Sequence, residues 1–474
     1  MAKRGRDEGQ AARPGGHAVW AASEFRNIDL GDARQAHRLV SVASRMAQQP
    51  GASIPLACGG WNETKAAYRF LSNEAVEPQR ILDAHREATI ERVAKHDTVL
   101  AIQDTTYLYQ GTRPATEGLG PIGEEWTRGM IAHTCLAVSP TGVPLGVLGQ
   151  HVWARPPQAK RLPENRRRGT PTAKKESQRW IDMLSTSAQG MPPGVRVVAV
   201  ADREADIFDF LSGAAALGQD VLIRSSYDRA TSDGYAWQEA EAAPVAGTME
   251  VEIPRSGGRP ARTAVLELRY VEVRVKKPDP RARRRPRPVL PLTMLIARER
   301  GAPKGVEPVC WKLLTSLPVG RPEDAIQCVK WYAMRWRIER FFYTLKSGCR
   351  VEDLQLKTLG RLNRALAVLS VVAWRLLALM YASREAPDVS SRGFLSDGEW
   401  RLAYCVVHRT RQPPSEAPTV RDGVRLIARL GGFLARKGDG EPGVKVLWRG
   451  FSRLHDLLLA ADYAANLGRG ATYG

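Results

Sequence analysis

The first stretch of the 474-residue chain has apolar residues at helical spacing. From Ala21 to about Arg92 they recur every three or four positions, whereas residues 1 to about 18 show no ordered pattern. Amphipathic helices are predicted over 32–49 and 61–73, and Arg34 and Arg38 fall on the exposed side of the first. We therefore predict a small helical domain over residues 1–92.

From Thr98 the pattern changes to short apolar runs separated by turns. Runs at 98–104 and 195–202 are typical of buried strands, and each ends in an aspartate, Asp104 or Asp202. A hairpin is predicted over 130–153, with its turn at residues 139–142. Helices are predicted over 174–189 and 205–217, and the apolar runs around them indicate an α/β core.

The second half of the chain combines an all-β segment with long helices. Alternating polar and apolar residues over about 226–310 predict antiparallel strands inserted into the core. Single helices are predicted from Ala325 to about Gly348 and over 361–383. The apolar stretch at 365–380 is short for a membrane span and contains Arg375, so it is interpreted as a buried helix.

These patterns predict three domains. The α/β core is expected over 93–383, with the β insertion inside it. It follows the helical domain of 1–92 and precedes a helical domain of 384–474.

The charge of the chain narrows the choice of partner. Hydrophobic residues make up 43% of the sequence, which is ordinary for a globular protein, but 70 Lys and Arg against 50 Asp and Glu give a net charge of +20 and a pI near 10. Such a surplus favours a polyanionic partner such as nucleic acid, with a generally basic proteome as the alternative.

Cysteines and the N-terminus carry little further signal. The six cysteines include no CxxC pair, so neither a zinc site nor a disulfide framework is indicated. This cysteine usage fits a reducing, cytoplasmic setting, and the charged N-terminus has no apolar core of a signal peptide.

Asp104 and Asp202 are the first candidate site. In a mixed sheet, neighbouring strand ends bring side chains together, and two adjacent carboxylates repel unless a cation neutralises them. Oxygen ligands of this kind hold Mg²⁺. The alternative for each aspartate is a turn former or a helix cap.

The predicted helix at 325–348 carries the second candidate site. At about 100° per residue, with Tyr332 at zero, Arg335 falls at about −60°, Glu339 at about −20° and Lys346 at about −40°. The apolar residues of the helix fall at roughly 180° to 280°. The alternative is a solvated face in which Arg335 and Glu339 form an i,i+4 ion pair.

Together the two sites describe phosphodiester chemistry. Three carboxylates can hold two metal ions that promote in-line displacement at phosphorus, while Arg, Lys and Tyr grip phosphate oxygens. The spacing Tyr-x₂-Arg-x₃-Glu-x₆-Lys, read at residues 332–346, resembles the signature of DDE transposases of bacterial insertion sequences. The similarity is to the hairpin-forming Tn5 type. It extends to AAYRFLSN, ADREADI, KESQRW and WKLLTSLPV, and covers nearly the whole chain.

The resemblance implies an RNase H-like core and specific roles for its residues. Asp104, Asp202 and Glu339 would be the catalytic triad, binding two Mg²⁺ ions that Mn²⁺ can replace. The implied DNA contacts are Tyr332, Arg335 and Lys346 on the phosphate backbone, Trp311 on a flipped base, Arg224 beside the site, and Arg34 and Arg38 on the transposon ends. The C-terminal helices would form the homodimer of the synaptic complex.

The resemblance also implies a reaction sequence: a nick at the transposon end, a hairpin, its opening and strand transfer into target DNA. Two alternatives remain open from the sequence. One is a non-catalytic, DNA-binding transposase derivative that acts as an inhibitor or regulator. The other is a metal-dependent nuclease without strand transfer. The basic tracts at 155–170 and 281–288 are expected either to add DNA contacts or to be solvated loops.

Overall fold

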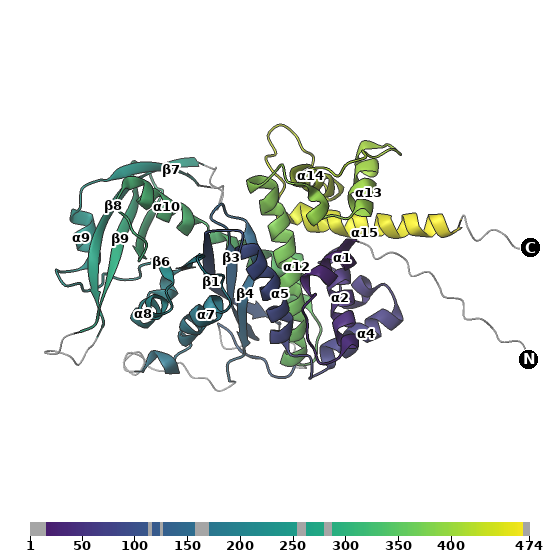
Figure 1. The fold of residues 1–474 in the computed structure, drawn as a ribbon, viewed down its shortest axis with the longest axis horizontal. Helices are drawn as coiled ribbons and strands as arrows, with labels where there is room; N and C mark the ends of the chain where they lie inside the picture. Colours follow the sequence, from purple (N-terminus) through teal and green to yellow (C-terminus); the bar gives the residue numbers. More distant parts are fainter. Residues whose placement is uncertain are drawn as a thin grey trace, which may run out of the picture. The chain divides into compact units, whose positions relative to one another are not determined.

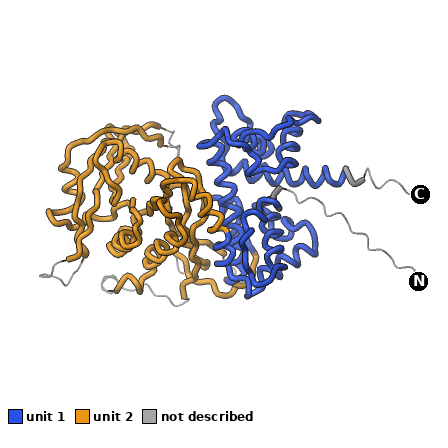
Figure 2. The backbone as a smooth tube through the Cα atoms, viewed as in Figure 1, with its two compact units in different colours: residues 1–84, 344–354, 360–474 blue, residues 85–343, 355–359 orange. Residues whose placement is uncertain are grey.

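The computed structural model describes residues 16–111, 116–123, 127–156, 170–253, 262–278 and 287–467. The chain forms two compact units, coloured separately in Figure 2. Unit 1 combines residues 1–84, 344–354 and 360–474, and unit 2 combines 85–343 and 355–359. Each unit is therefore built from stretches that are distant in the sequence.

Unit 1 begins with short helices. They are α1 (Gly16–Glu24), α2 (Ala33–Gln48), α3 (Ile54–Cys58), α4 (Trp61–Ser72) and α5 (Pro78–Val93), which continues into unit 2. The predicted helices over 32–49 and 61–73 are confirmed as α2 and α4. Asp32 caps α2, because its carboxylate accepts a 2.8 Å hydrogen bond from the backbone N–H of Arg34. Gly59 ends α3 with φ of +73°, a left-handed conformation that favours glycine.

The remainder of unit 1 is also helical. Its long helices are α12 (Leu359–Glu385), α13 (Asp397–His408), α14 (Val420–Leu430) and α15 (Val444–Leu467). In the part of the chain that the structure describes, α12 alone is long and apolar enough to cross a membrane, and its most apolar window is entirely buried inside the protein. Helix α12 is thus a core helix, as predicted. Its Arg375 is buried, donates to the carbonyl of Phe394 at 2.8 Å and lies over the ring of Trp20.

A ten-stranded mixed sheet forms the centre of unit 2, in the order β2-β3-β1-β5-β6-β10-β9-β8-β7 with β4 paired to β3 (Figure 1). The strands are β1 (Thr98–Tyr109), β2 (Gly120–Pro121), β3 (Arg128–Val138), β4 (Pro144–Trp153), β5 (Arg196–Ala201), β6 (Asp220–Arg224), β7 (Gly247–Ile253), β8 (Arg262–Lys276), β9 (Val289–Glu299) and β10 (Cys310–Thr315). Neighbours β1, β5 and β6 run parallel, and the rest pair antiparallel. The predicted α/β, RNase H-like class is confirmed.

The predicted insertion over 226–310 extends this same sheet. Strand β10 pairs with β6 on one side and with β9 on the other, so β7 to β9 continue the central sheet outward. The expectation of an all-β segment was wrong in one respect. Helix α9 (Ala236–Ala242) lies within it, because Ala236 and Ala240 pack against the cluster of buried side chains under β8 and β9.

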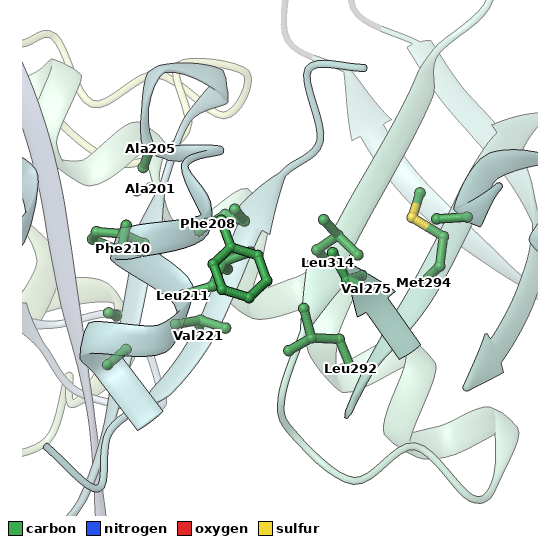
Figure 3. Close-up of a cluster of buried hydrophobic side chains, with 14 of the residues drawn as sticks. Ala201, Ala205, Phe208, Phe210, Leu211, Val221, Val275, Leu292, Met294 and Leu314 are labelled. Atoms are coloured by element: carbon green, nitrogen blue, oxygen red, sulfur yellow. The ribbon is translucent and has the colours of Figure 1, made fainter. Parts of the chain in front are cut away.

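Helices cover the two faces of the sheet. Helices α7 (Gln178–Ala188) and α8 (Phe208–Ala216) pack on one face, and Figure 3 shows Phe208, Phe210 and Leu211 of α8 at the cluster they form with Val221 and Leu314. Helix α10 (Pro322–Ala333) packs on the opposite face, where Cys328 contacts Thr315. Alternation along each strand therefore sends neighbouring residues to different helices.

Two predicted elements differ from those observed. Strand β1 does not end at Asp104, because residues 105–109 continue the antiparallel pairing with β3. The single helix predicted over 325–348 is interrupted: α10 ends at Ala333, α11 spans Trp336–Tyr343, and a π-helical turn spans Thr344–Gly348. At the interruption the backbone N–H of Arg335 bonds the carbonyl of Tyr332 at 2.9 Å, so the turn tightens to 3₁₀ spacing.

Candidate active site

Asp104 and Asp202 follow the parallel pairing of β1 with β5. The pairing ends at Ile102 and Val200, so both aspartates lie just beyond it, Asp104 within β1 and Asp202 directly after β5. Asp202 begins a short 3₁₀ turn, and its Oδ1 accepts a 2.8 Å hydrogen bond from the backbone N–H of Glu204. Asp202 is thus a cap, as the alternative interpretation expected, and it also faces a second carboxylate.

Alternation along β1 decides which side of the sheet Asp104 faces. Ala101 belongs to the cluster under α7, so Asp104, three residues on, faces the opposite side. There Arg335 donates to Asp104 Oδ2 at 3.0 Å and to Glu339 Oε1 at 3.3 Å. The i,i+4 pair expected from a solvated face is therefore present, but its arginine also reaches a buried strand 231 residues away in the sequence.

Asp104 is held in an unfavourable environment. Burial raises its pKa to about 7, and the charge of nearby Asp202 adds to this shift while Arg335 opposes it. Its side chain is 14% exposed, whereas that of Glu339 is 43% exposed. A carboxyl group of this kind is typical of functional sites, since folding alone does not favour it.

The three carboxylates do not form one coordination group. Among the described residues, no three His, Cys, Asp or Glu side chains lie close enough together to hold a metal ion. Instead the guanidinium of Arg335 lies between Asp104 and Glu339. The three carboxylates nevertheless offer hard oxygen ligands, which suit a divalent cation. In this structure the positive charge beside Asp104 and Glu339 comes from Arg335. The assignment of Asp104, Asp202 and Glu339 as metal ligands stays a prediction.

A cavity of about 440 Å³ adjoins the end of β6. Trp311 and Arg224 line this cavity. They are the residues predicted to contact a flipped base and the DNA beside it. Tyr332 is buried on the sheet face of α10, and its ring meets that of Trp311 edge-on with centroids 5.8 Å apart. Arg224 donates to the carbonyl of Cys310 at 3.3 Å, and burial lowers its pKa.

Three transposase family models match the chain. A transposase DNA-binding model matches residues 17–76, a transposase DDE domain matches residues 166–375, and the Tn5 transposase dimerisation domain matches residues 371–470. The chain belongs to the Tn5-type DDE transposases. It is an enzyme with a DNA-binding domain, a DDE catalytic domain that uses divalent metal, and a dimerisation domain.

The matched ranges of the transposase contain most of the predicted site residues. Asp202, Arg335 and Glu339 lie within the DDE match, whereas Asp104 precedes it. Asp104 is therefore joined to the others by the structure, through its contact with Arg335. The predicted domain boundaries at 92 and 383 stay predictions.

Lys346, the last member of the signature, follows α11 in the chain. It belongs to the π-helical turn of unit 1 and pairs with Glu352 at 3.8 Å. The predicted phosphate contact of Lys346 stays a prediction.

Arg34 and Arg38 both lie on α2, inside the DNA-binding match. The side chain of Arg34 is 85% exposed and pairs with Asp32 at 3.1 Å. Arg38 is half-buried and lines a small cavity with Arg45 and Asn62.

Sequence reasoning missed a basic and aromatic face on α4. Its exposed residues Trp61, Lys65, Tyr68 and Arg69 fall within about 100° of one another around the helix axis, opposite the buried Ala67. The 3.6-residue period of the predicted helix contained this signal, and exposure was needed to identify it. A face of this composition suits nucleic acid.

The cavity adds two further residues that sequence reasoning left unassigned. Arg203 follows Asp202 directly in ADREADI, and Trp237 of α9 donates to Ser225 Oγ at 2.9 Å. Trp237 gave no sequence signal, because its approach depends on the packing of α9. Most of the two basic tracts, 157–169 and 281–286, lies outside the described residues.

Proposed function

We propose that this transposase excises its element through hairpin intermediates and joins it to target DNA, with Asp104, Asp202 and Glu339 as its catalytic triad. One observation carries the assignment: Arg335 contacts carboxylates from β1 and α11, beside Asp202 at the end of β5. These elements are distant in sequence, and their carboxylates repel in the absence of a cation. Folding alone gives no reason for such an arrangement.

The chemistry of the donors favours Mg²⁺, with Mn²⁺ as a substitute. Two such ions held by the triad would activate the attacking oxygen and stabilise the leaving oxygen of an in-line displacement. All three side chains offer carboxylate oxygen, and neither histidine nor cysteine belongs to the predicted set.

Arg335 has two roles in this proposal. Its guanidinium balances Asp104 and Glu339 when they have no other cation. Bound divalent ions would supply the positive charge that Asp104 and Glu339 require, and Arg335 would then bind a phosphate oxygen of the DNA. The fork of five N–H donors suits both carboxylate and phosphate.

The cavity beside the site is proposed to receive a base flipped out of the transposon end. Trp311 offers an aromatic surface, and the cavity wall carries the cations Arg203, Arg224 and Lys312. Extracting a base costs a few kcal/mol, of which stacking on an aromatic ring returns part. Tyr332 and Lys346 are proposed to hold the neighbouring phosphates.

The proposed reaction consists of four displacements at phosphorus. Water first breaks the P–O3′ bond at the transposon end and leaves a free 3′-OH. That hydroxyl attacks the opposite strand, so a new P–O bond closes a hairpin as the flanking DNA leaves. A second water opens the hairpin, and the 3′-OH then attacks target DNA. A homodimer is proposed to hold both ends in the bacterial cytoplasm.

The test uses DNA from the flanks of this gene, where the transposon ends are expected. The duplex is incubated with wild type, Glu339→Ala or the control Glu323→Ala, in Mg²⁺ or Mn²⁺, and the products are separated on a denaturing gel. Glu323 is an exposed acidic residue in the first turn of α10. Nicks, hairpins and joined strands are expected with wild type and Glu323→Ala, and Glu339→Ala should produce none.

The products also separate the alternatives. DNA binding without cleavage by all three proteins would contradict the catalytic proposal and favour the regulatory derivative. Cleavage without hairpins or joined strands would favour a nuclease.

A further inference from the structure

The side of β1 that faces away from Asp104 carries a second polar group. Gln103 and Thr105 flank Asp104 in the sequence, so alternation sends both toward α7. Here Thr105 meets Arg179, whose Nε donates to the threonine Oγ1 at 3.0 Å. Arg179 is therefore placed directly beneath the strand segment that carries Asp104, without contacting that carboxylate.

Arg179 uses all of its nitrogen atoms within the protein. Its Nη2 donates to Glu204 Oε2 at 2.5 Å, and its Nη1 donates to the carbonyl of Glu176 at 2.8 Å. Its side chain is only 11% exposed. Such a side chain is poorly placed to bind DNA, because each of its nitrogen atoms already donates a hydrogen bond within the protein and little of the side chain reaches solvent.

Two partners of Arg179 each adjoin a predicted metal ligand. The backbone N–H of Thr105 donates to Asp104 Oδ1 at 2.7 Å. The backbone N–H of Glu204 donates to Asp202 Oδ1 at 2.8 Å. One guanidinium thus joins the two backbone segments that orient Asp104 and Asp202.

A buried histidine fixes Thr105 in turn. His133 Nδ1 lies 2.9 Å from Thr105 Oγ1, and its Nε2 lies 3.3 Å from Gln103 Oε1. Because Gln103 Oε1 can only accept, Nε2 carries the proton and Nδ1 accepts from the threonine hydroxyl. The hydrogen bonds therefore run in one direction, from Arg179 through Thr105 to His133 and Gln103. This series ends at Gln103, whose buried Nε2 has no hydrogen-bond partner among the described residues.

We propose that Arg179 is a positioning residue that sets the separation of Asp104 and Asp202 and thereby the affinity of the site for divalent cations. It touches neither metal nor substrate, and it acts through Thr105 and Glu204. The inference rests on the proposed function, because it takes the two aspartates as ligands. Residues that orient metal ligands typically change metal affinity by about 10–100-fold when they are replaced.

The experiment measures Mn²⁺ binding to the full-length protein by calorimetry. Arg179→Ala is expected to weaken Mn²⁺ binding by about 10-fold or more, and Arg179→Lys, which keeps the charge but not the fork, by less. The matched control is Arg262→Gln, since Arg262, like Arg179, is a partly buried arginine paired with a carboxylate, here Glu299. It should leave Mn²⁺ affinity unchanged.

Thr105 supplies a second pair of variants in case Arg179→Ala does not fold. Thr105→Val keeps the shape but removes the hydroxyl, so it should weaken Mn²⁺ binding. Thr105→Ser keeps the hydroxyl and should restore the affinity. A general packing defect would lower thermal stability in both variants without this rescue.

The outcomes separate this inference from the proposed function. Wild-type Mn²⁺ affinity in folded Arg179→Ala and Thr105→Val would overturn the positioning role and leave the triad intact. Loss of Mn²⁺ binding by Asp202→Ala but not by Arg179→Ala would have the same meaning. Absence of Mn²⁺ binding in the wild type would overturn the proposed function and this inference with it.

Discussion

Asp104 shows at the scale of one residue how function opposes stability. Its carboxyl group is buried beside Asp202, and together these raise its pKa to about 7. The unfolded chain has an ordinary aspartate with a pKa near 3.8. Ionisation is therefore harder in the folded protein, and the folded state loses stability as pH rises from about 4 to about 7.

This shift leads to a prediction for Asp104→Asn. Without metal, the substitution should raise the melting temperature at pH 8, where Asp104 is charged, and change it little at pH 4.5, where Asp104 is protonated in the folded protein. Scanning fluorimetry in EDTA measures both values. An equal gain at both pH values would instead indicate a packing effect, and destabilisation at pH 8 would contradict the pKa shift.

Arg335 has a contact that the spacing of residues in the sequence did not predict. The i,i+4 relation to Glu339 was visible in the sequence, and it suited both a solvated face and a functional one. The bond to Asp104 goes beyond a solvated helix face, since it joins the turn between α10 and α11 to the interior of strand β1.

At the scale of elements, the turn after β5 depends on a buried ion pair. Asp206 accepts from Arg229 Nε at 2.6 Å and from the backbone N–H of Ser226 at 2.7 Å. The side chains of Asp206 and Arg229 are 0% and 1% exposed. The second aspartate of ADREADI therefore anchors the turn that begins at Asp202.

Removing one partner of this pair should be costly. Arg229→Met leaves the charge of Asp206 buried without its partner, so the free energy of unfolding should fall by about 3–5 kcal/mol. Urea denaturation measures the change. The double variant Asp206→Leu with Arg229→Met should recover part of the loss, because no uncompensated charge remains. A single variant as stable as the wild type would show that the pair contributes nothing.

The interrupted helix has a consequence at the same scale. The 3₁₀ bonds at Met334 and Arg335 change the rotation between α10 and α11, because a 3₁₀ turn takes about 3.0 residues where a continuous α-helix takes about 3.6. Tyr332 is consequently buried against Trp311, while Arg335 and Glu339 remain partly accessible beside Asp104. Tyr332, Arg335 and Glu339, predicted to share one face of a single helix, thus lie in two neighbouring environments.

At the scale of the whole molecule, the charge of +20 and the DNA-binding match concern the same partner. Phosphate contacts release counterions, so binding to DNA should weaken steeply with salt. Residues that contact phosphate determine the slope of that dependence, whereas exposed cations elsewhere contribute little.

Arg34 provides a test of this relation. Arg34→Ala should weaken binding to a duplex from the gene flanks and reduce the slope of log affinity against log salt by about 1. Fluorescence anisotropy at several salt concentrations measures both. Arg300→Ala is the control, since Arg300 is 75% exposed in the strand-rich part of unit 2. The same slope in both variants would mean that Arg34 does not contact phosphate.

The sequence by itself determined much about this transposase. Periodicity located α2, α4, the β3–β4 hairpin and the strands that precede Asp202 and follow α9, because burial on one face imposes a repeat of 3.6 or 2 residues. The spaced signature at 332–346 led to the family, which the three matches confirm. Local patterns sufficed for these inferences, since helices and strands depend mainly on neighbouring residues.

Only the tertiary structure decided which distant residues meet. The contact of Asp104 with Arg335, the pKa of Asp104 and the network through Arg179 depend on pairing and packing between elements far apart in the sequence. The interruption at Met334 and the extension of β1 past Asp104 have the same origin, because neighbouring elements there outweigh local propensity. Burial and charge at a site are properties of the folded chain. The spacing of residues in the sequence could therefore identify the site residues but could not predict their environment.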